Sequence, residues 1–521
     1  MQSNFKIVLI ALYDWNALGV RTLHSLLKEN RINVTSVFFK LSNPNNTMDE
    51  ATDSEINTLI SLLKGIAPSL VAISLRSSMF KLSAKISHKI KEELGVLTIW
   101  GGIHPTIRPE QSLEYADLVC LGEGEKTIVE LCKRLSSGSD YSDIGNLWAR
   151  HNGKIIRNRL YPLIEDLNSI PFPDFANENK YLIERNKILS LPTLDDRAEY
   201  DIMTSRGCPF SCSYCCNNTY IRIYKGLGKY VRRRSVENVI KELRMAKETF
   251  SALSYIYFYD DVFTMDKEWL VEFSQQYRKF ISLPFFCYTH PNYADEDTLS
   301  LLKESGLKDV TMGIQAGSKF IRDIFFKRPT SNEKIVEGAH IFKRHHINVS
   351  YDILLDNPFE KDEDRRETLG LLLSLPKPFQ LHTHTLAYFP ETELTNLAIE
   401  KGYIENDDIE DQKQQTTKRW TSTLDLSRDK ENLFWDNLYY MSKKSYFPNW
   451  LVIRLSNNRF LKQNPKYLTI ILKTFTYDIH SASTGRFKIV YLIFNALKML
   501  FSGEFLRFKS HFKMYLKRSF G

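Results

Sequence analysis

Two long blocks of this chain alternate short apolar runs with segments of helical periodicity, which limits the folds the chain can adopt. In the first 150 residues, runs rich in Val, Ile and Leu come at 6–12, 34–39, 70–75, 97–100 and 118–121. Helical-period segments come at 18–27, 54–63, 81–94 and 125–135. This alternation favours a parallel sheet with helices on both faces. Five such units predict an α/β domain of flavodoxin-like (Rossmann-type) topology, with ligands bound beyond the carboxyl ends of its strands.

The alternation returns in the second block. Strand-like runs come at 200–203, 255–259, 285–289, 310–314, 349–355 and 380–389, separated by helical segments at 235–249, 266–280, 295–305, 332–344 and 361–375. Between the blocks, Asn152 to Lys154 predict a hairpin that finishes the first domain, and the prolines of 166–175 predict an extended connection. We therefore expect a first domain at 1–150, a linker at 151–197, a second domain at 198–400 and a mainly helical C-terminal region at 401–521.

A loop with three cysteines follows the first strand of the second block. Cys208, Cys212 and Cys215 have the spacing C-x3-C-x2-C. Three thiolates on one tight loop can ligate three irons of a cubane cluster and leave the fourth iron without a protein ligand. Three ordinary core thiols or a zinc knuckle are the alternatives. Zinc usually takes four ligands in two pairs, no second CxxC or HxxxH pair is present, and structural thiols rarely cluster in a Pro- and Ser-containing loop. Cys216 is interpreted as a bystander.

With Tyr214 before its last cysteine, this loop resembles the cluster loop of the radical-SAM superfamily. The resemblance implies a 4Fe-4S cluster whose open iron chelates S-adenosylmethionine, and reductive cleavage to a 5′-deoxyadenosyl radical with electrons from an external flavodoxin- or ferredoxin-type donor. The six strands match the partial (β/α)6 barrel of that family. Asp260 and Asp261, in Asp-Asp-x-Phe, and Gln315, in Gly-Ile-Gln-Ala-Gly-Ser, resemble segments near the S-adenosylmethionine site. Gln315 replaces the Glu of the family pattern.

Loops after the strands of the first block resemble those of the cobalamin-binding domain that precedes many radical-SAM domains. The predicted cofactor contacts are Asn16, Gly19, Ser74, Arg76, Gly102, His104, Gly122 and Glu123. Asp14 and Gly19 match the motif Asp-x-His-x-x-Gly, but Asn16 stands where that motif has the lower cobalt ligand. The resemblance therefore implies base-off, His-off binding, with Arg76 as the candidate cover of the lower cobalt face.

Each of these loops, taken alone, could also have a purely structural role. His104 could be a surface loop residue, and residues 122–124 could be a turn that enters a helix. Four matching loops at the ends of the predicted strands are more specific than any one of them. We therefore expect a cobalamin-binding domain.

Other polar side chains lie near the predicted strand ends of the second block. These candidates are Tyr288, His290, Asn292, Asp352, Asp356, His382, His384 and Tyr388. His382 and His384 share one face of their strand, because side chains alternate along a strand. Two histidines could form a metal site, but no third ligand is evident from the sequence. Barrel-lining packing is the alternative for each residue, and Tyr388 is our catalytic candidate, as a substrate contact or proton donor.

The distribution of cysteines and the lengths of the apolar runs indicate the cellular compartment. Seven cysteines, with three in one loop and the others scattered, argue against a disulfide framework and indicate a reducing compartment. The first apolar run lacks the length, basic flank and cleavage site of a signal peptide. No apolar run reaches the roughly 20 residues of a spanning helix. A cytoplasmic protein is expected.

Positive charge is concentrated near the C-terminus. Of 70 Lys and Arg in the chain, 15 lie between Met441 and Gly521, where only two residues are acidic. Helical patterns at 430–444, interleaved aromatic and basic residues at 467–520 and an apolar stretch at 487–501 accompany this charge. The region could contact an anionic membrane surface, hold a phosphate-rich substrate, or cap the barrel with a solvated basic face. Nucleic-acid binding is not expected, because no known module accompanies the charge.

Together these features resemble class B radical-SAM methyltransferases. The resemblance implies a cobalamin-dependent enzyme, cytoplasmic or associated with a membrane surface, that methylates an unactivated carbon of a small-molecule or lipid-like substrate. Two alternatives stay open. One is a cobalamin-linked radical cyclase or rearrangement enzyme that transfers no methyl group, and the other is a non-catalytic iron-sulfur and corrinoid sensing module.

Overall fold

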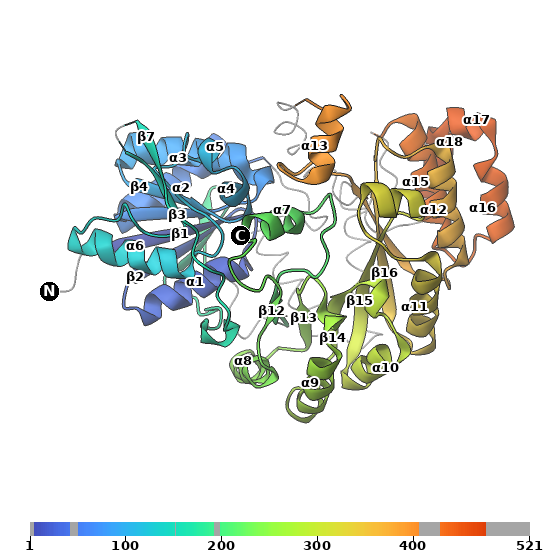
Figure 1. Cartoon of the computed structure of the whole chain (residues 1–521), viewed down its shortest axis with the longest axis horizontal. Helices are drawn as coiled ribbons and strands as arrows, with labels where there is room; N and C mark the ends of the chain where they lie inside the picture. The colour runs from blue at the N-terminus through green and yellow to red at the C-terminus, as the bar shows by residue number, and fades with distance from the viewer. Residues whose placement is uncertain (1–4, 42–49, 152, 192–197, 406–427, 476–521) are drawn as a thin grey trace.

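Two sheets lie beside each other, one mainly and one wholly parallel, and each is wrapped by helices (Figure 1). The computed structural model describes residues 5–41, 50–151, 153–191, 198–405 and 428–475. Helix α7 (Cys216–Ile223) lies between the two sheets and contacts α4 (Ile103–Ile107) of the first domain. The two predicted α/β units are therefore packed against each other.

The first domain has a nine-stranded sheet in the order β7-β6-β5-β4-β3-β1-β2-β8-β9. Its parallel centre confirms the predicted flavodoxin-like order and consists of β5 (Leu118–Cys120), β4 (Leu97–Gly101), β3 (Leu70–Ser74), β1 (Lys6–Leu12) and β2 (Asn33–Phe39). Alternate residues of β1 pack on opposite layers, which explains why the strand is apolar throughout. One layer contains α2 (Asp53–Ile66) and α3 (Phe80–Leu94), and the other α1 (Leu18–Glu29) and α6 (Glu125–Ser137).

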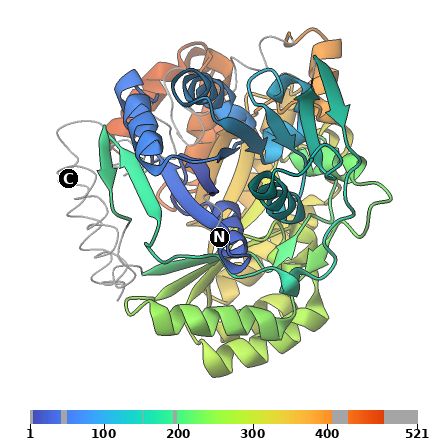
Figure 2. The ribbon, with the colours of Figure 1, turned by 90° about the vertical axis from the view of Figure 1, so that its left-hand side faces the viewer.

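Hairpins extend this sheet at both edges (Figure 2). The predicted hairpin forms β6 (Leu147–His151) and β7 (Lys154–Arg157), which run antiparallel beside β5. At the other edge, β8 (Lys180–Glu184) pairs in parallel with β2, and β9 (Lys187–Leu189) returns beside β8.

The prediction that residues 151–197 form a linker was therefore wrong for 180–189. Ile183 of β8 is fully buried, so this short, charge-flanked strand belongs to the core of the first domain. Arg185 and Asn186 both have positive φ, at 51° and 63°, as the tight turn of a two-residue hairpin requires. The strands are too short and too charged to stand out as apolar runs. The preceding connection holds only a short 3-10 turn, η2 (Leu167–Ser169).

The second domain has six parallel strands in chain order, as predicted. They are β10 (Glu199–Ile202), β13 (Tyr255–Phe258), β14 (Phe285–Thr289), β15 (Leu307–Gln315), β16 (Asn348–Leu355) and β17 (Gln380–Thr385). Their outer face packs on α8 (Val236–Thr249), α9 (Lys267–Phe280), α10 (Glu296–Ser305), α11 (Asn332–Arg344) and α12 (Asp362–Ser374). The strands β10 and β17 are the two edges of the sheet, which matches an open barrel. β17 ends four residues before the predicted end.

Helices beyond residue 428 pack on the outside of this barrel. They are α15 (Lys430–Ser442), α16 (Asn449–Ser456), α17 (Arg459–Gln463) and α18 (Pro465–Phe475). Trp435 and Tyr439 of α15 are almost fully buried in the same core cluster as the barrel strands. The predicted helix at 430–444 is therefore part of the barrel layer. The apolar stretch at 487–501 and the basic end of the chain lie outside the described residues.

Within the described residues, none of the helices combines the length and the apolar character that a membrane span requires.

The two tryptophans of the C-terminal helices provide a matched test of this packing. Replacing the buried Trp435 with Ala should lower the free energy of unfolding of the second domain by about 3–5 kcal/mol, because it leaves a large cavity. Trp450→Ala should change it by no more than about 0.5 kcal/mol, because that ring is 65% exposed. Urea unfolding followed by circular dichroism measures both. Equal effects of the two substitutions would contradict the arrangement of α15.

Candidate active site

The three cysteines lie on a loop that leaves the carboxyl end of β10 and enters α7. Cys212 is buried, and Cys208 and Cys215 are partly exposed. The amide of Cys215 donates to the carbonyl of Cys212 at 3.0 Å, and Cys215 is the N-cap residue of α7. A turn and a helix start therefore fix the backbone of the loop at Cys212 and Cys215.

The start of this loop is held by a buried carboxylate. Asp260, which follows β13, is fully buried and accepts hydrogen bonds from the amide of Thr204 at 3.1 Å, from the Thr204 hydroxyl at 2.7 Å and from the hydroxyl of Ser205. Its carboxylate therefore positions the start of the loop, and the contact of Asp260 with S-adenosylmethionine stays a prediction. Asp261 points the other way, into a cavity, and accepts a hydrogen bond from Asn217 at 3.2 Å.

Gly207 and Ser213 fix the rest of the loop. Gly207 has a φ of +86°, and a Cβ atom at this position would lie 2.4 Å from the carbonyl oxygen of Tyr230. The backbones of Gly207 and Tyr230 come this close because they adjoin the antiparallel pair of β11 (Ser205–Arg206) and β12 (Arg232–Arg233). The amide of Ser213 donates to Phe326 at 3.0 Å. Only glycine can precede Cys208 in this backbone conformation.

The thiols lie in contrasting electrostatic surroundings. The Cys216 thiol hydrogen-bonds to Cys215 and lowers the pKa of Cys215 to about 7, against the opposing effect of burial. Burial raises the pKa of Cys208 to about 12. A guanidinium nitrogen of Arg328 lies 3.5 Å from the sulfur of Cys212, and its other nitrogen donates to the carbonyl of Gly313 at 3.0 Å. A buried cation beside the thiols suits an anionic metal cluster.

Aromatic residues predicted near the site meet beside this loop. Tyr214 and Tyr388 are partly buried against the same apolar cluster, and the rings of Tyr214 and Phe326 are 5.0 Å apart. Burial raises the pKa of both phenols, so they are protonated at neutral pH. Gln315 lies at the carboxyl end of β15 with a φ of +71°, where that strand leaves the sheet. The roles of these three residues stay predictions.

A cavity of about 550 Å³ separates the strand-end loops of the first domain from the cysteine loop. Residues of the first domain that line it include Gly19, Ser74, Gly102, Gly122 and Glu123, five of the eight predicted cofactor contacts. Cys216, Asn217 and Tyr220 of α7 line the opposite wall, and Gly207 and Asp261 join them. A deeper part reaches Leu9, Ala72, Ile99, Cys120 and Ile128 inside the first domain. The cavity is therefore shared by both domains.

The glycines of this cavity fit a large flat ligand with an inserted tail. Gly102 has a φ of +102°, and a Cβ atom there would lie 2.8 Å from the carbonyl oxygen of Leu75. Gly122 has a φ of +66°, and a Cβ atom there would overlap the hydroxyl of Tyr224. Both positions therefore require glycine, and the cavity lining there is backbone without a side chain. The exposed Ser74 hydroxyl and the apolar recess behind it fit a nucleotide tail.

Three predicted cofactor residues do not line this cavity. Asn16 donates a hydrogen bond from its side chain to Asp201 of β10 and so connects the two domains. Arg76 is exposed at the start of a short 3-10 turn. His104 is fully buried, with its Nδ1 atom 3.1 Å from the hydroxyl of Ser77, so the interpretation as a surface residue was wrong. A cofactor contact from these side chains stays a prediction.

A cluster of opposite charges joins the two domains beside the cavity. Glu123 of the first domain pairs with Arg206 at 2.9 Å and with Arg232 at 3.0 Å, and Glu125 pairs with Arg206 at 2.5 Å. Burial alone would lower the pKa of Arg206, but Glu125 and Glu123 raise it above its usual value. Sequence reasoning predicts Glu123 as a cofactor contact, which stays a prediction. It missed these pairs because the partners of Glu123 lie more than 80 positions away.

Two family models match the two domains. The model of the radical SAM superfamily matches residues 202–372. The model of the B12 binding domain matches residues 6–132. The first match begins at the last residue of β10 and contains the cysteine loop and the four barrel strands β13 to β16. The second contains β1 to β5 with their connecting loops.

Curated relatives share a quarter or more of their residues with this chain over the matched part. An uncharacterized methyltransferase of Pyrococcus horikoshii, PH0819, is 28% identical over 68% of this chain and 74% of its own length. The cytidylyl-2-hydroxyethylphosphonate methyltransferase of Streptomyces wedmorensis is 26% identical over 55% of this chain. The anaerobic magnesium-protoporphyrin IX monomethyl ester cyclase of Rubrivivax gelatinosus is 25% identical over 61%. This chain spans about half the length of the last two, 56% and 55%.

Solved structures share the fold. The radical S-adenosylmethionine methyltransferase TsrM of Kitasatospora setae superimposes with a TM-score of 0.59 at 17% identity, over 76% of both chains. The cobalamin-dependent S-adenosylmethionine radical enzyme OxsB superimposes with a TM-score of 0.61 at 16% identity, over 96% of this chain and 76% of its own. The arrangement of a B12-binding domain against a partial barrel is therefore shared with both.

The backbone of the cysteine loop can be tested without touching a cysteine. Gly207→Ala should reduce the iron bound per chain after anaerobic reconstitution to about a tenth or less, because the added Cβ would clash with Tyr230 and move Cys208. Gly370→Ala, where a Cβ atom meets nothing within 4 Å, should keep the iron content of the unaltered chain. Full iron loading of the Gly207 variant would contradict this account of the loop.

Proposed function

We propose that this chain, which belongs to the radical SAM superfamily and carries a B12-binding domain ahead of its radical SAM domain, methylates an unactivated carbon of its substrate. One observation carries the proposal: the glycine-walled cavity of the first domain opens toward the cysteine loop of the second. A corrinoid in this cavity would lie beside the loop whose cysteines would hold the cluster. Such proximity is what the transfer of a methyl group to a substrate radical requires.

Named residues would hold each cofactor. Cys208, Cys212 and Cys215 would ligate a 4Fe-4S cluster, and the bare backbone of Gly102 and Gly122 would face the corrinoid. When bound, the cluster with S-adenosylmethionine supplies a 5′-deoxyadenosyl radical, and cobalamin supplies the methyl group.

Other residues of the site would hold the cysteine loop in position and keep water out of the space between the domains. Arg328 places a buried positive charge against Cys212, and Asp260 holds the start of the loop. The charge cluster of Glu123, Glu125, Arg206 and Arg232 keeps the two domains together, and so limits the access of water between them.

The substrate is proposed to enter the inner face of the barrel. Side chains on this face, such as Asp201, Tyr257, Tyr288 and Asp352, are polar or aromatic. They suit a small molecule that carries hydrogen-bonding groups beside an apolar part. Tyr388 lies beyond the end of β17 and would contact such a substrate or donate a proton to it. Electrons would come from an external flavodoxin- or ferredoxin-type protein in the cytoplasm.

The C-terminal helices support a contact with a membrane surface. Large apolar side chains are exposed on α16 to α18, with Trp450 at 65%, Phe460 at 61% and Tyr467 at 57%. Basic residues lie among them on the same helices, at Arg454, Arg459, Lys462 and Lys466. Interfacial helices of peripheral proteins combine exposed aromatic residues with basic residues in this way. We propose that these helices rest on an anionic membrane surface, which would suit a lipid-like substrate.

Isotope transfer tests the methylation. The reconstituted enzyme, supplied with S-adenosylmethionine labelled in its methyl group, cobalamin, a reductant and a cell extract, should label a product and release 5′-deoxyadenosine. Cys212→Ala should abolish both, because the cluster loses a ligand, whereas Cys132→Ala, a buried thiol of the first domain, should keep both. Mass spectrometry measures product and nucleoside.

The other outcomes decide between the alternatives. Formation of 5′-deoxyadenosine and an altered product without label would favour the cyclase or rearrangement enzyme, the activity that the magnesium-protoporphyrin relatives are named for. An intact cluster that never yields 5′-deoxyadenosine would favour the sensing module and overturn the enzymatic proposal.

Vesicle binding tests the membrane contact. The full-length chain should sediment with vesicles that contain about 30% phosphatidylserine and should remain soluble with pure phosphatidylcholine, because basic side chains require anionic lipid. The double substitution Trp450→Ala and Phe460→Ala should reduce binding at least fivefold, since both rings are exposed. Val271→Ala, an exposed apolar residue on α9, is the control and should bind as the unaltered chain does. Equal binding of the double variant would contradict the proposal.

A further inference from the structure

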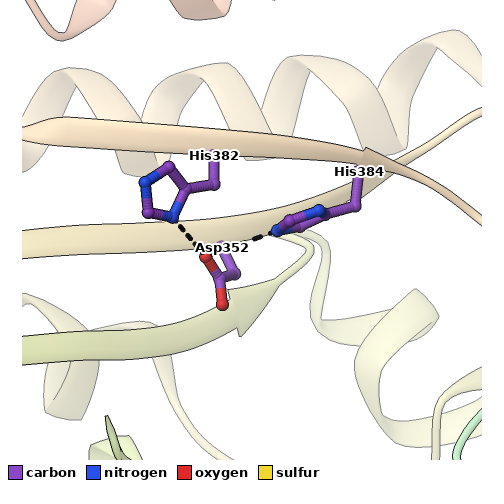
Figure 3. Close-up of side chains that lie close together, drawn as sticks. All are labelled: Asp352, His382 and His384. Carbon is purple, nitrogen blue, oxygen red and sulfur yellow. Dashed lines mark hydrogen bonds and ion pairs between the residues drawn. The ribbon is translucent and has the colours of Figure 1, made fainter. Parts of the chain in front are cut away.

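Three potential metal ligands converge on the inner face of the barrel, away from the cysteine loop. Asp352 lies on β16, and His382 and His384 lie on the edge strand β17 (Figure 3). Asp352 and His382 are directly opposite each other in the parallel pairing, and His384 follows two residues later. Residues two apart on a strand share a face, so both imidazoles project to the same side as the carboxylate. Figure 3 shows both rings turned toward Asp352.

This face of the two strands is the one that the outer helices leave uncovered. The alternate residues Tyr351, Ile353 and Leu381 are buried in the core under α11 and α12. Asp352 and His384 are each about one fifth exposed, and His382 is nearly half exposed. The cluster therefore has a rigid base and an open side.

The spacing of the donor atoms fits a single cation. The Asp352 Oδ1 atom is 3.0 Å from Nδ1 of His382 and 3.5 Å from Nε2 of His384, and one donor atom of each residue lies within 4.8 Å of the others. Two ligands that each lie about 2.1 Å from a tetrahedral zinc ion are about 3.4 Å from each other. The distances of 3.0 Å and 3.5 Å lie on either side of this value.

A purely hydrogen-bonded cluster explains the geometry less well. N–H···O bonds are usually 2.7–3.2 Å long, and the contact of His384 with Oδ1 is longer than that. In addition, both rings approach the same carboxylate oxygen. A cation between the three side chains would be ligated by one donor atom from each of them.

We propose that Asp352, His382 and His384 bind one divalent cation that accepts imidazole ligands, such as Zn²⁺ or Fe²⁺. Two imidazoles and one carboxylate are a common donor set for these ions, and three protein ligands leave at least one position for water or a substrate. An oxygen or nitrogen donor of the substrate would take that position and be held against the inner face. The site does not depend on the methylation proposed above, because it uses residues of neither the cysteine loop nor the cavity.

Zinc content tests the site directly. The protein with its iron-sulfur cluster reconstituted is treated with a chelator, equilibrated with Zn²⁺ and desalted, and zinc and iron per chain are measured by elemental analysis. The unaltered chain should retain about one zinc per chain, and His384→Gln and Asp352→Asn should each retain less than a tenth of that. His88→Ala removes an exposed histidine that pairs with Glu92 at 3.1 Å, and this variant should retain the zinc.

Two further measurements separate this site from other causes of zinc loss or gain. X-ray absorption at the zinc edge should show only nitrogen and oxygen neighbours near 2.0–2.1 Å, whereas a sulfur shell near 2.3 Å would assign the zinc to vacant cysteines and overturn the proposal. Zinc should also raise the melting temperature of the unaltered chain and of His88→Ala but not of His384→Gln, since a ligand of the folded state stabilises it. Zinc retention in both the His384 and Asp352 variants would equally overturn it.

Discussion

The site depends on the charge cluster that ties the cysteine loop to the first domain. Arg206 lies two residues before Cys208. It pairs with Glu123, in the loop after β5, and with Glu125, the first residue of α6. Because these charges are largely buried, loss of one partner would cost roughly 3–5 kcal/mol by leaving the other charge without a counterion. The cluster therefore does more than add stability. It sets the position of the cysteine loop relative to the strand-end loops, and so sets the shape of the cavity between them.

The sequence predicted those parts of the fold that rest on local patterns. Strands buried on both faces, such as β1 and β3, are continuous apolar runs, and their limits were close to those observed. The strand β8 was missed because its apolar residues, such as Ile183, are few and lie between Lys180 and Glu184, which are buried as well. A strand of this kind is specified by its pairing with β2, which no local pattern in the sequence contains.

The same limit applies to the site. The spacing of the cysteines is local, and it indicated the cluster loop directly. The anchors of that loop are not local: Arg328 reaches Cys212 across 116 positions, and Asp260 reaches Thr204 across 56. The Asp-Asp sequence gave no sign that its two members diverge, with Asp260 buried under the loop and Asp261 in the cavity. The sequence identified residue types suited to the chemistry, but their partners followed only from the packing.

Side chains alternate along a strand, so β16 and β17 have an apolar face packed against the helices and an opposite face that carries the potential metal ligands. Tyr351 and Ile353 pack beneath the helices, while Asp352 between them points to the opposite side. The third metal ligand that the sequence could not supply for His382 and His384 is thus a residue 30 positions earlier, which the parallel register places opposite. A one-residue shift of β17 would turn both histidines into the core. The burial of Leu381 and Thr383 opposes such a shift, so the apolar packing of the outer layer also holds the inner ligands in place.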